Sequence, residues 1–445
     1  MPSDPPINPQ PNGEAKADPG LPTVTPPSGG MFFRLFGVPA LIVGGLVLVL
    51  IVAQPLIGKA SKFFLGRTWG TASPEQFLRD LDNPNKEVRW RAANDLAQVL
   101  LRDDNLASDS DFALQLTQRL RRTLDSSAPF EKVHAEQFAK LSPEEKAREL
   151  KKLEADRDYV LLLAQLLSRF MVPVGASVLE EMAVQESGLD PRALHARRRQ
   201  ALWALANLGE NVKRFDKLST EQQDAVKVQL ETAADSGEQA AAAKATLNYL
   251  TRRQEGHPNA LGVDRVVERS AVAEDPSLRE LAAFVANFWS GNADENARME
   301  KALVRLCDDP GKGEEELAKL EDENQQEETR KLVKKPGFRV QINAAIALAR
   351  QGWKVRPSLL QTMLDEDELR SIFVVQSKKG GAERPDEATV VETTLNALKA
   401  VAELHRKDPQ RDLSDLRPNI DKLAHNPNPT VQTEAGRVVL ALSKP

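Results

Sequence analysis

Residue types that carry out catalysis or bind metals are few in this chain. Two histidines four residues apart on a helix, as in HExxH, would bind zinc, but no two histidines here have that spacing. The single cysteine, Cys307, excludes an intrachain disulfide and a cysteine-based zinc site. The five histidines, which we interpret as solvated or capping residues, are His134, His195, His257, His405 and His425.

Other catalytic motifs are incomplete. The Gly-Lys-Gly at residues 311–313 lacks the earlier glycine and the following Ser or Thr of a phosphate-binding loop. Four aspartates between residues 103 and 111 lack the central glycine and final glutamate of a calcium loop. No GxSxG or SxxK motif is present. We therefore predict no catalytic, cofactor-binding or metal-binding residues, no cofactor, and a protein that is not an enzyme.

Two charged segments could instead contact a partner. The densest basic run is Arg197-Arg198-Arg199. We favour a structural interpretation, in which one arginine serves the fold and the others are solvated, over contact with an anion or acidic partner at a helix start. Residues 308–335 are acidic first and then basic, which indicates either a solvated extra helix or an arm that docks a partner.

The overall charge disfavours nucleic acid as a partner. The 445 residues carry 60 Lys and Arg against 65 Asp and Glu, a net charge of −5. A protein that neutralises many phosphates usually has a basic excess. The length exceeds what a single core supports, so the chain must hold several domains or one elongated repeat array.

The N-terminal region indicates attachment to a membrane. Residues 1–30 are rich in proline and predict a disordered tail. Residues 35–58 contain no charge, and about 20 such residues cross a bilayer as a helix. In the linker, residues 59–70, Lys59, Lys62 and Arg67 outnumber the single Arg34 before the span. This bias predicts a single-pass membrane protein with a cytoplasmic body and the tail on the opposite side.

From residue 71 onward the sequence predicts helix after helix. Ser-Pro-Glu starts at residues 73 and 142 predict capping boxes, and Phe112, Leu116, Leu120 and Leu124 predict one buried helical face. Gly209 and Gly352 follow apolar helical segments and predict C-terminal caps. The tryptophans at 90, 203 and 289 fall within predicted helices, where we expect them to pack.

A short phrase recurs along the helical body. Its form is Pro-x-x-x-Val-x-x-x-Ala-Ala-x-x-Leu, in which proline sets the turn and the small residues let helices approach closely. Complete or partial copies occur at 84–96, 336–348 and 427–439, and shorter ones begin at Arg198 and Arg279. Each helix pair would expose an apolar face that only the next pair can cover.

These segments resemble the HEAT-repeat family, most closely at LDNPNKEVRWRAANDLA, residues 81–97. The resemblance implies an all-α fold, a HEAT-like, armadillo-like α-solenoid of about seven to nine helix pairs over residues 71–445. It also implies a ladder between repeats in which Asp82 fits with Arg89 and Asp275 with Arg279. Three stretches do not fit the repeat and predict inserts near 126–141, 308–335 and 368–388, the last as a loop.

We therefore predict a membrane-tethered α-solenoid scaffold that binds partner proteins and contacts the lipid bilayer through residues 35–58. The alternatives are a HEAT-like enzyme that acts on nucleic acid or a tetrapyrrole, and a structural cell-envelope protein whose tail contacts the wall. The sequence does not identify the partner.

Overall fold

The computed structural model describes residues 73–443, with gaps at 139–140, 236, 314–328 and 378–380. The predicted tail (1–30), membrane span (35–58) and linker (59–70) lie outside these residues. Among the helices of the described part, none combines the length and apolar composition needed to cross a bilayer.

The described residues are mainly helical, as predicted. In chain order the elements are α3 (Pro74–Leu81), α4 (Lys86–Leu100), α5 (Asp104–Ser108), α6 (Ser110–Phe138), α7 (Pro143–Leu167), α8 (Ala176–Ala183), α9 (Pro191–Phe215), α10 (Thr220–Ala234), α11 (Ala240–Gln254), α12 (Val263–Ser270), α13 (Pro276–Ala286), α14 (Ala293–Leu306), β1 (Thr329–Val333), α16 (Phe338–Gln351), α17 (Pro357–Met363), α18 (Glu366–Ile372), β2 (Phe373–Ser377), β3 (Arg384–Pro385), α19 (Glu387–Lys407), the 3-10 helix η2 (Ser414–Leu416), α20 (Arg417–Leu423) and α21 (Pro429–Leu442).

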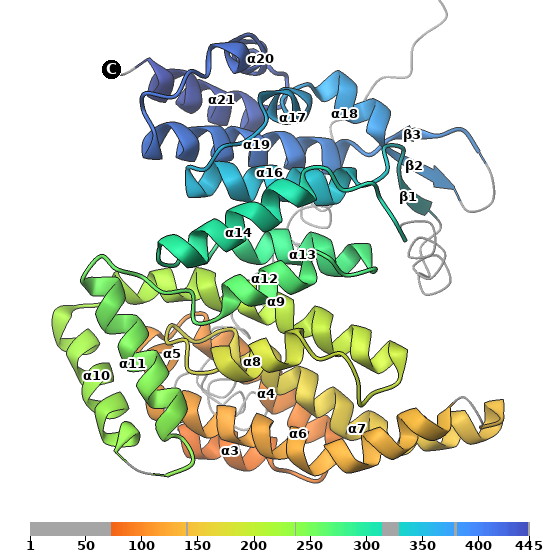
Figure 1. The fold of residues 1–445 in the computed structure, drawn as a ribbon, viewed down its shortest axis with the longest axis vertical. Coiled ribbons are helices and arrows are strands. Elements are labelled where there is room, and N and C mark those ends of the chain that lie inside the picture. Colours follow the sequence, from red (N-terminus) through yellow and green to blue (C-terminus); the bar gives the residue numbers. More distant parts are fainter. Residues whose placement is uncertain (1–72, 139–140, 236, 314–328, 378–380, 444–445) are drawn as a thin grey trace, which may run out of the picture. The chain divides into compact units, whose positions relative to one another are not determined.

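One succession of helices packs in order along the body (Figure 1). Helix α7 packs on α9, α9 on α13, α13 on α16, α16 on α19 and α19 on α21. The recurring phrase falls on α4, α16 and α21, and its shorter copies on α9 and α13. Its alanines are buried, including Ala92, Ala282, Ala344 and Ala435. The small side chains thus lie where helices meet, as the phrase predicted.

Helix starts follow the predicted chemistry in part. Ser142 forms a complete capping box with Glu145 at the start of α7. Ser73 precedes α3 with proline in the first turn, but its side chain makes no capping hydrogen bond. Gly352 ends α16 in the left-handed conformation, φ +81°, as expected of a C-terminal cap.

Gly209 does not end a helix, contrary to prediction, because α9 continues through it to Phe215. The glycine instead admits the ring of Trp289. A Cβ at position 209 would lie 2.5 Å from Trp289 Nε1. That nitrogen donates a 2.8 Å hydrogen bond to the Leu205 carbonyl oxygen. The missing side chain therefore permits a close helix contact rather than a turn.

The described residues of the three predicted inserts contain regular structure. Residues 126–138 continue α6. Residues 329–333 form strand β1, so the helix considered for this segment is wrong there. Within the loop predicted over 368–388, residues 368–377 belong instead to α18 and β2, and residues 384–385 form β3. Strands β1, β2 and β3 form an antiparallel sheet in that order, with Val333 opposite Phe373. Two segments distant in sequence thus complete one small sheet.

The implied ladder pairs differ from those expected. Arg119, not Arg89, pairs with Asp82 at 2.9 Å, and Arg89 lies over the Tyr159 ring. His195 pairs with Asp275, whose carboxylate also caps α13. Arg279, buried in α13, bonds Asp309 after α14 at 2.5 and 3.1 Å. Each of these ion pairs therefore joins two different helices or their flanking residues.

Candidate functional site

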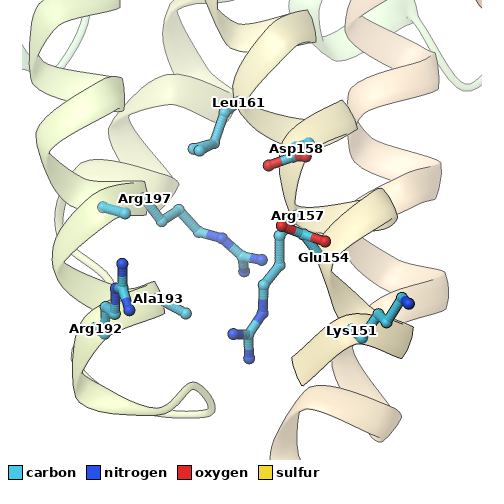
Figure 2. Close-up of a pocket in the computed structure, with 9 residues that line it drawn as sticks. Lys151, Glu154, Arg157, Asp158, Leu161, Arg192, Ala193 and Arg197 are labelled. Atoms are coloured by element: carbon cyan, nitrogen blue, oxygen red, sulfur yellow. The ribbon is translucent and has the colours of Figure 1, made fainter. Parts of the chain in front are cut away.

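A cavity of about 410 Å³ opens between α7 and α9. Figure 2 shows the side chains of the two helices facing one another across it. Six of the nine lining residues are charged, and the lining comprises Lys151, Glu154, Arg157, Asp158 and Leu161 of α7 and Arg192, Ala193, Ala196 and Arg197 of α9.

The spacing of these residues explains why they meet. On α7 they recur every three or four residues, and on α9 two pairs lie four residues apart, so each set occupies one helical face. Asp190 caps α9 by accepting a hydrogen bond from the Ala193 amide, and Pro191 occupies the first turn. Where α9 faces α7, Ala193 and Ala196 have short side chains. The helices therefore leave space between them here.

Buried ion pairs lie behind this cavity. Arg157 donates to both oxygens of Glu131, at 2.9 and 2.6 Å, and pairs with Asp190 at 2.7 Å. Glu131 is 1% exposed and Asp190 2%. Burying these charges costs free energy unless they are paired and hydrogen-bonded. The two carboxylates together neutralise Arg157 and fix its guanidinium.

Arg197 is buried with less compensation. Its side chain is 8% exposed, and its Nη2 lies 3.9 Å from Glu131 Oε1, an oxygen that already accepts from Arg157. Among described residues its hydrogen-bond partner is Gln185 Oε1, at 3.3 Å. A guanidinium has five N–H donors. Burial lowers the pKa of Arg197, an effect opposed by Glu131 and reinforced by Arg157. In Figure 2 the guanidinium of Arg197 extends into the space between the helices.

The rim carries exposed groups of both signs. Arg192 and Lys151 are exposed cations on opposite helices, and Glu154 is an exposed carboxylate. Asp158 forms an ion pair with Lys86 of α4. The surplus of positive charge inside and around the cavity favours an anionic ligand over a neutral or cationic one.

The basic run identified in the sequence divides into three environments. Arg197 lines the cavity, Arg198 is half-buried and donates to the Ala183 carbonyl oxygen at 3.1 Å, and Arg199 is exposed. Arg199 is exposed, as the favoured interpretation expects, but Arg197 and Arg198 both have partners in the fold, where that interpretation expected only one such arginine. The position of Arg197 at the cavity also suits the anion-contact alternative. The partners of Arg197, Glu131 and Gln185, lie outside α9, so residue spacing alone could not distinguish Arg197 from the other two arginines.

Of the two histidines near this region, His134 is buried rather than solvated, contrary to expectation, whereas His195 is partly exposed. His134 of α6 is 6% exposed, and its Nε2 lies 3.9 Å from Asp190 Oδ2. His195 of α9 lies 2.5 Å from Asp275 Oδ2. Although burial raises the pKa of Asp275, hydrogen bonds from His195 and Ser277 lower it to about 2. Among the described residues, no group of three His, Cys, Asp or Glu could hold a metal ion.

The tryptophans also separate into different roles. Trp289 is 1% exposed and packs as predicted, whereas Trp90 is 61% exposed. Trp203 is 41% exposed and meets Phe284 edge to face, with ring centroids 5.1 Å apart. Phe284 in turn contacts Phe288. The expectation of packing is therefore wrong for Trp90 and holds in part for Trp203.

No protein-family model matches the chain, and no curated protein matches it. One solved structure that matches is the crystal structure of an engineered protein, at 15% sequence identity, covering 83% of this chain and 99% of that chain. Its TM-score is 0.17, so this likeness carries no argument about fold or function. The HEAT-repeat resemblance remains a prediction from the sequence.

Proposed function

We propose that this protein is a membrane-tethered α-solenoid scaffold that binds an acidic segment of a partner protein in the cavity between α7 and α9. The observation that supports this proposal is Arg197, a buried guanidinium at the cavity with one hydrogen bond among described residues. A bound carboxylate or similar anion would satisfy its remaining donors, and hydrogen bonds between charged groups are stronger than neutral ones.

Two further features support the scaffold. The order of packing, α9 on α13, α13 on α16 and α16 on α19, is what stacked helix pairs would give, and stacked pairs offer extended surfaces for partners. The uncharged segment 35–58 would supply the membrane anchor. Arg279–Asp309 and Arg119–Asp82 join separate helices and would resist sliding between units.

The test compares two arginines of the same helix. The full-length wild-type protein, in detergent micelles, is cross-linked to its partners in an extract. The Arg192→Glu and Arg199→Glu variants are treated in the same way. Arg192 lines the cavity, whereas Arg199 is exposed and outside its lining, so the two changes alter net charge equally. We expect Arg192→Glu to lose the specific partner and Arg199→Glu to keep it. The wild-type complex should weaken with added salt.

Equal capture by both variants would refute the binding site, and turnover of a substrate by the purified chain would refute the scaffold. Deleting residues 308–335 is a poor alternative test. That deletion removes β1, which pairs with β2, and Asp309, which binds Arg279. A lost partner could then reflect damage to the fold.

A labelling experiment that tests the predicted membrane orientation requires cysteines introduced at exposed positions. Cys307 is 7% exposed, and burial raises the pKa of its thiol to about 12, so a thiol reagent reacts poorly with it. In a Cys307→Ser background, we expect Ser28→Cys in the tail to react with an impermeant reagent in intact cells. Ser443→Cys, exposed at the end of the described chain, should react only after permeabilisation. The reverse pattern would invert the predicted orientation.

A further inference from the structure

We infer that the face shared by α9, α13, α16 and α19 is a second interaction surface, which binds an acidic peptide segment through an aromatic side chain that the segment carries. These four helices pack in succession, as Figure 1 shows. The surface is separate from the cavity between α7 and α9, so the inference goes beyond the proposed function. It combines a series of partly exposed rings with neighbouring cations that have no ion partner.

The rings lie on two neighbouring helices. Trp203 of α9 is 41% exposed and meets Phe284 of α13 edge to face. Phe284 meets Phe288 in the same way, and the ring centroids are 5.1 Å apart in both pairs. Phe284 and Phe288 are half-buried. The three rings therefore leave apolar area in water, which an incoming aromatic side chain would bury in an edge-to-face contact.

Three cations continue the surface beyond these rings. Lys213 of α9 lies over the Phe288 ring, with its Nζ 5.2 Å from the centroid. Arg350 of α16 is close enough to Lys213 to repel it, and the stem of Lys407 of α19 lies against Gly352. Among the described residues, none of the three cations has an ion-pair or hydrogen-bond partner for its charged group. Partial loss of surrounding water lowers the pKa of each.

The charge of this region is positive overall. Arg253, which also lies near Lys213, is matched by Asp216 in a two-bond ion pair. Glu403 pairs with Arg406 at 2.7 Å, so Glu210 is the remaining carboxylate beside the unpaired cations. Four cations and two carboxylates leave two positive charges in excess: Lys213, Arg350, Arg406 and Lys407 against Glu210 and Glu403. An acidic partner is therefore attracted to this face.

The positions of the cations have a second explanation, which the rings do not share. Lys213, Arg350 and Lys407 each lie in the last turn of a helix. A cation there interacts favourably with the helix dipole. The dipole explains why a cation lies at each helix end, but it does not explain why partly exposed rings adjoin them. A control at another helix end separates the two explanations.

The ring geometry favours a peptide over single-stranded nucleic acid. Successive bases stack on open ring faces. Here the rings stand at 85° and 76° to one another, and Lys213 covers a face of Phe288. Glu210 and Glu403 would also repel a continuous row of phosphates. A peptide can instead place one aromatic side chain against the rings and its carboxylates beside the cations.

The experiment measures binding of synthetic peptide pools to the full chain in lipid nanodiscs. Arg192→Glu is present throughout, so that the cavity between α7 and α9 does not contribute. The probe pool has a central phenylalanine flanked by glutamates and then by degenerate residues. One matched pool carries lysine in place of glutamate, and another carries serine in place of phenylalanine. We expect the probe pool to bind about tenfold more tightly than the lysine pool and about fivefold more tightly than the serine pool.

A matched pair of variants tests the cations. Arg350→Glu should weaken binding of the probe pool by about tenfold. Arg305→Glu makes the same change in the last turn of α14, which is not one of the four helices, and should leave binding unchanged. Both changes oppose the helix dipole equally. If thermal melting shows that Arg350→Glu is unfolded, Lys407→Glu, at an exposed position, provides the same comparison.

A third variant tests the rings separately from the charges. Trp203→Ala should remove the preference for phenylalanine over serine and retain the preference for glutamate over lysine. A purely structural role of Trp203 would not separate these two preferences. Loss of neither preference in this variant would overturn the assignment of the rings to the binding surface.

The other outcomes separate this inference from the proposed function. Equal binding of the three pools, or equal losses in Arg350→Glu and Arg305→Glu, would overturn the second surface. The cavity would be unaffected by that result, because Arg192→Glu already removes its contribution. Binding of the probe pool to the wild-type chain but not in the Arg192→Glu background would place the peptide in the cavity instead. Tighter binding of a single-stranded oligonucleotide than of the probe pool, lost in Arg350→Glu, would replace the peptide by nucleic acid.

Discussion

Helix α9 packs against α13 through mainly apolar residues and against α7 through residues that include buried charges. Toward α13 the buried contact is mostly apolar, with Trp289 seated over Gly209 and buried alanines along α13, and the partly exposed His195–Asp275 pair lies at the start of α13. Toward α7 it includes buried charges, namely Arg157, Arg197 and the carboxylates of Glu131 and Asp190. An apolar contact is stable when its shapes fit, whereas a charged one is stable only when every ion is matched. Arg197, whose ion pair with Glu131 is long at 3.9 Å, therefore marks the side where a ligand would complete the interface.

The largest expected effect comes from placing a charge in the apolar part. Ala345 of α16 is fully buried, and α16 packs against both α13 and α19. Ala345→Asp buries an unpaired carboxylate, which should lower the free energy of unfolding by about 3 kcal/mol or more. Thermal melting of the full chain checks this loss. A melting temperature like that of the wild type would show that the alanine faces are not closed as described.

A smaller loss is expected from filling the space beneath Trp289. In Gly209→Ala the new methyl group would lie 2.5 Å from Trp289 Nε1 and 2.9 Å from Phe288 Cβ. Overpacking of this kind costs about 1–3 kcal/mol. The matched control is Gly436→Ala in α21, where a Cβ meets nothing within 4 Å and helix propensity favours alanine by up to about 1 kcal/mol. Replacing glycine by alanine should therefore lower the melting temperature at position 209 and raise it at position 436.

The pattern of small residues was readable in the sequence because it is local. Proline turns, capping residues and alanines at helical spacing all act within one or two turns of helix. They predicted where α4, α13, α16 and α21 would lie. Trp289 meets Leu205, 84 residues away, and nothing near Gly209 in sequence signals that ring. A glycine after an apolar segment is typical of a helix end, so the local pattern favoured the wrong role.

Charged residues were harder to assign, for a related reason. Residues 308–335, acidic first and then basic, were consistent with a solvated extra helix, but Lys331 lies in β1 opposite Val375 and pairs with Asp386. Whether an arginine is solvated or buried depends on the helix that covers it. Arg197 and Arg199 are two residues apart and differ completely in exposure. Sequence identified the basic run as a candidate contact, and only tertiary packing selected one member of it.

The partly buried carboxyl group of Glu180 gives a pH-dependent contrast between an unpaired and a paired acid. Glu180 of α8 lies against Gly262 at the start of α12, and its Oε1 has no hydrogen-bond partner among described residues. Burial, followed by repulsion from Asp264 and Glu181, raises its pKa to about 8, with Arg265 opposing. Asp264, by contrast, pairs with Arg298 at 2.7 Å. Glu180 is therefore protonated in the folded protein at neutral pH.

Because this pKa is raised from the unfolded value of 4.5, the contribution to stability is fully present below pH 4.5 and is lost as the pH rises through 8. Across that window the free energy of unfolding should fall by up to about 1.4 kcal/mol per pH unit from this group. Glu180→Gln keeps the shape without the titration, so its stability should decline less over the same range. Parallel pH dependence of the wild type and the variant, measured by denaturant unfolding, would contradict the assignment.

The smallest expected effect on stability lies at the rim of the charged interface. Asp158 pairs with Lys86 across α7 and α4, but both side chains are about half exposed. An ion pair in water contributes about 0–1 kcal/mol, so Asp158→Asn should barely change the melting temperature. The same substitution removes a negative charge from the cavity lining and leaves Lys86 unmatched nearby, so the acidic segment proposed for the cavity should bind more tightly. Stability and binding should thus respond in different proportions here, whereas at Ala345 the loss of stability dominates. If Asp158→Asn instead lowered the melting temperature strongly and left partner binding unchanged, this rim would belong to the structural core and the ligand site would lie elsewhere.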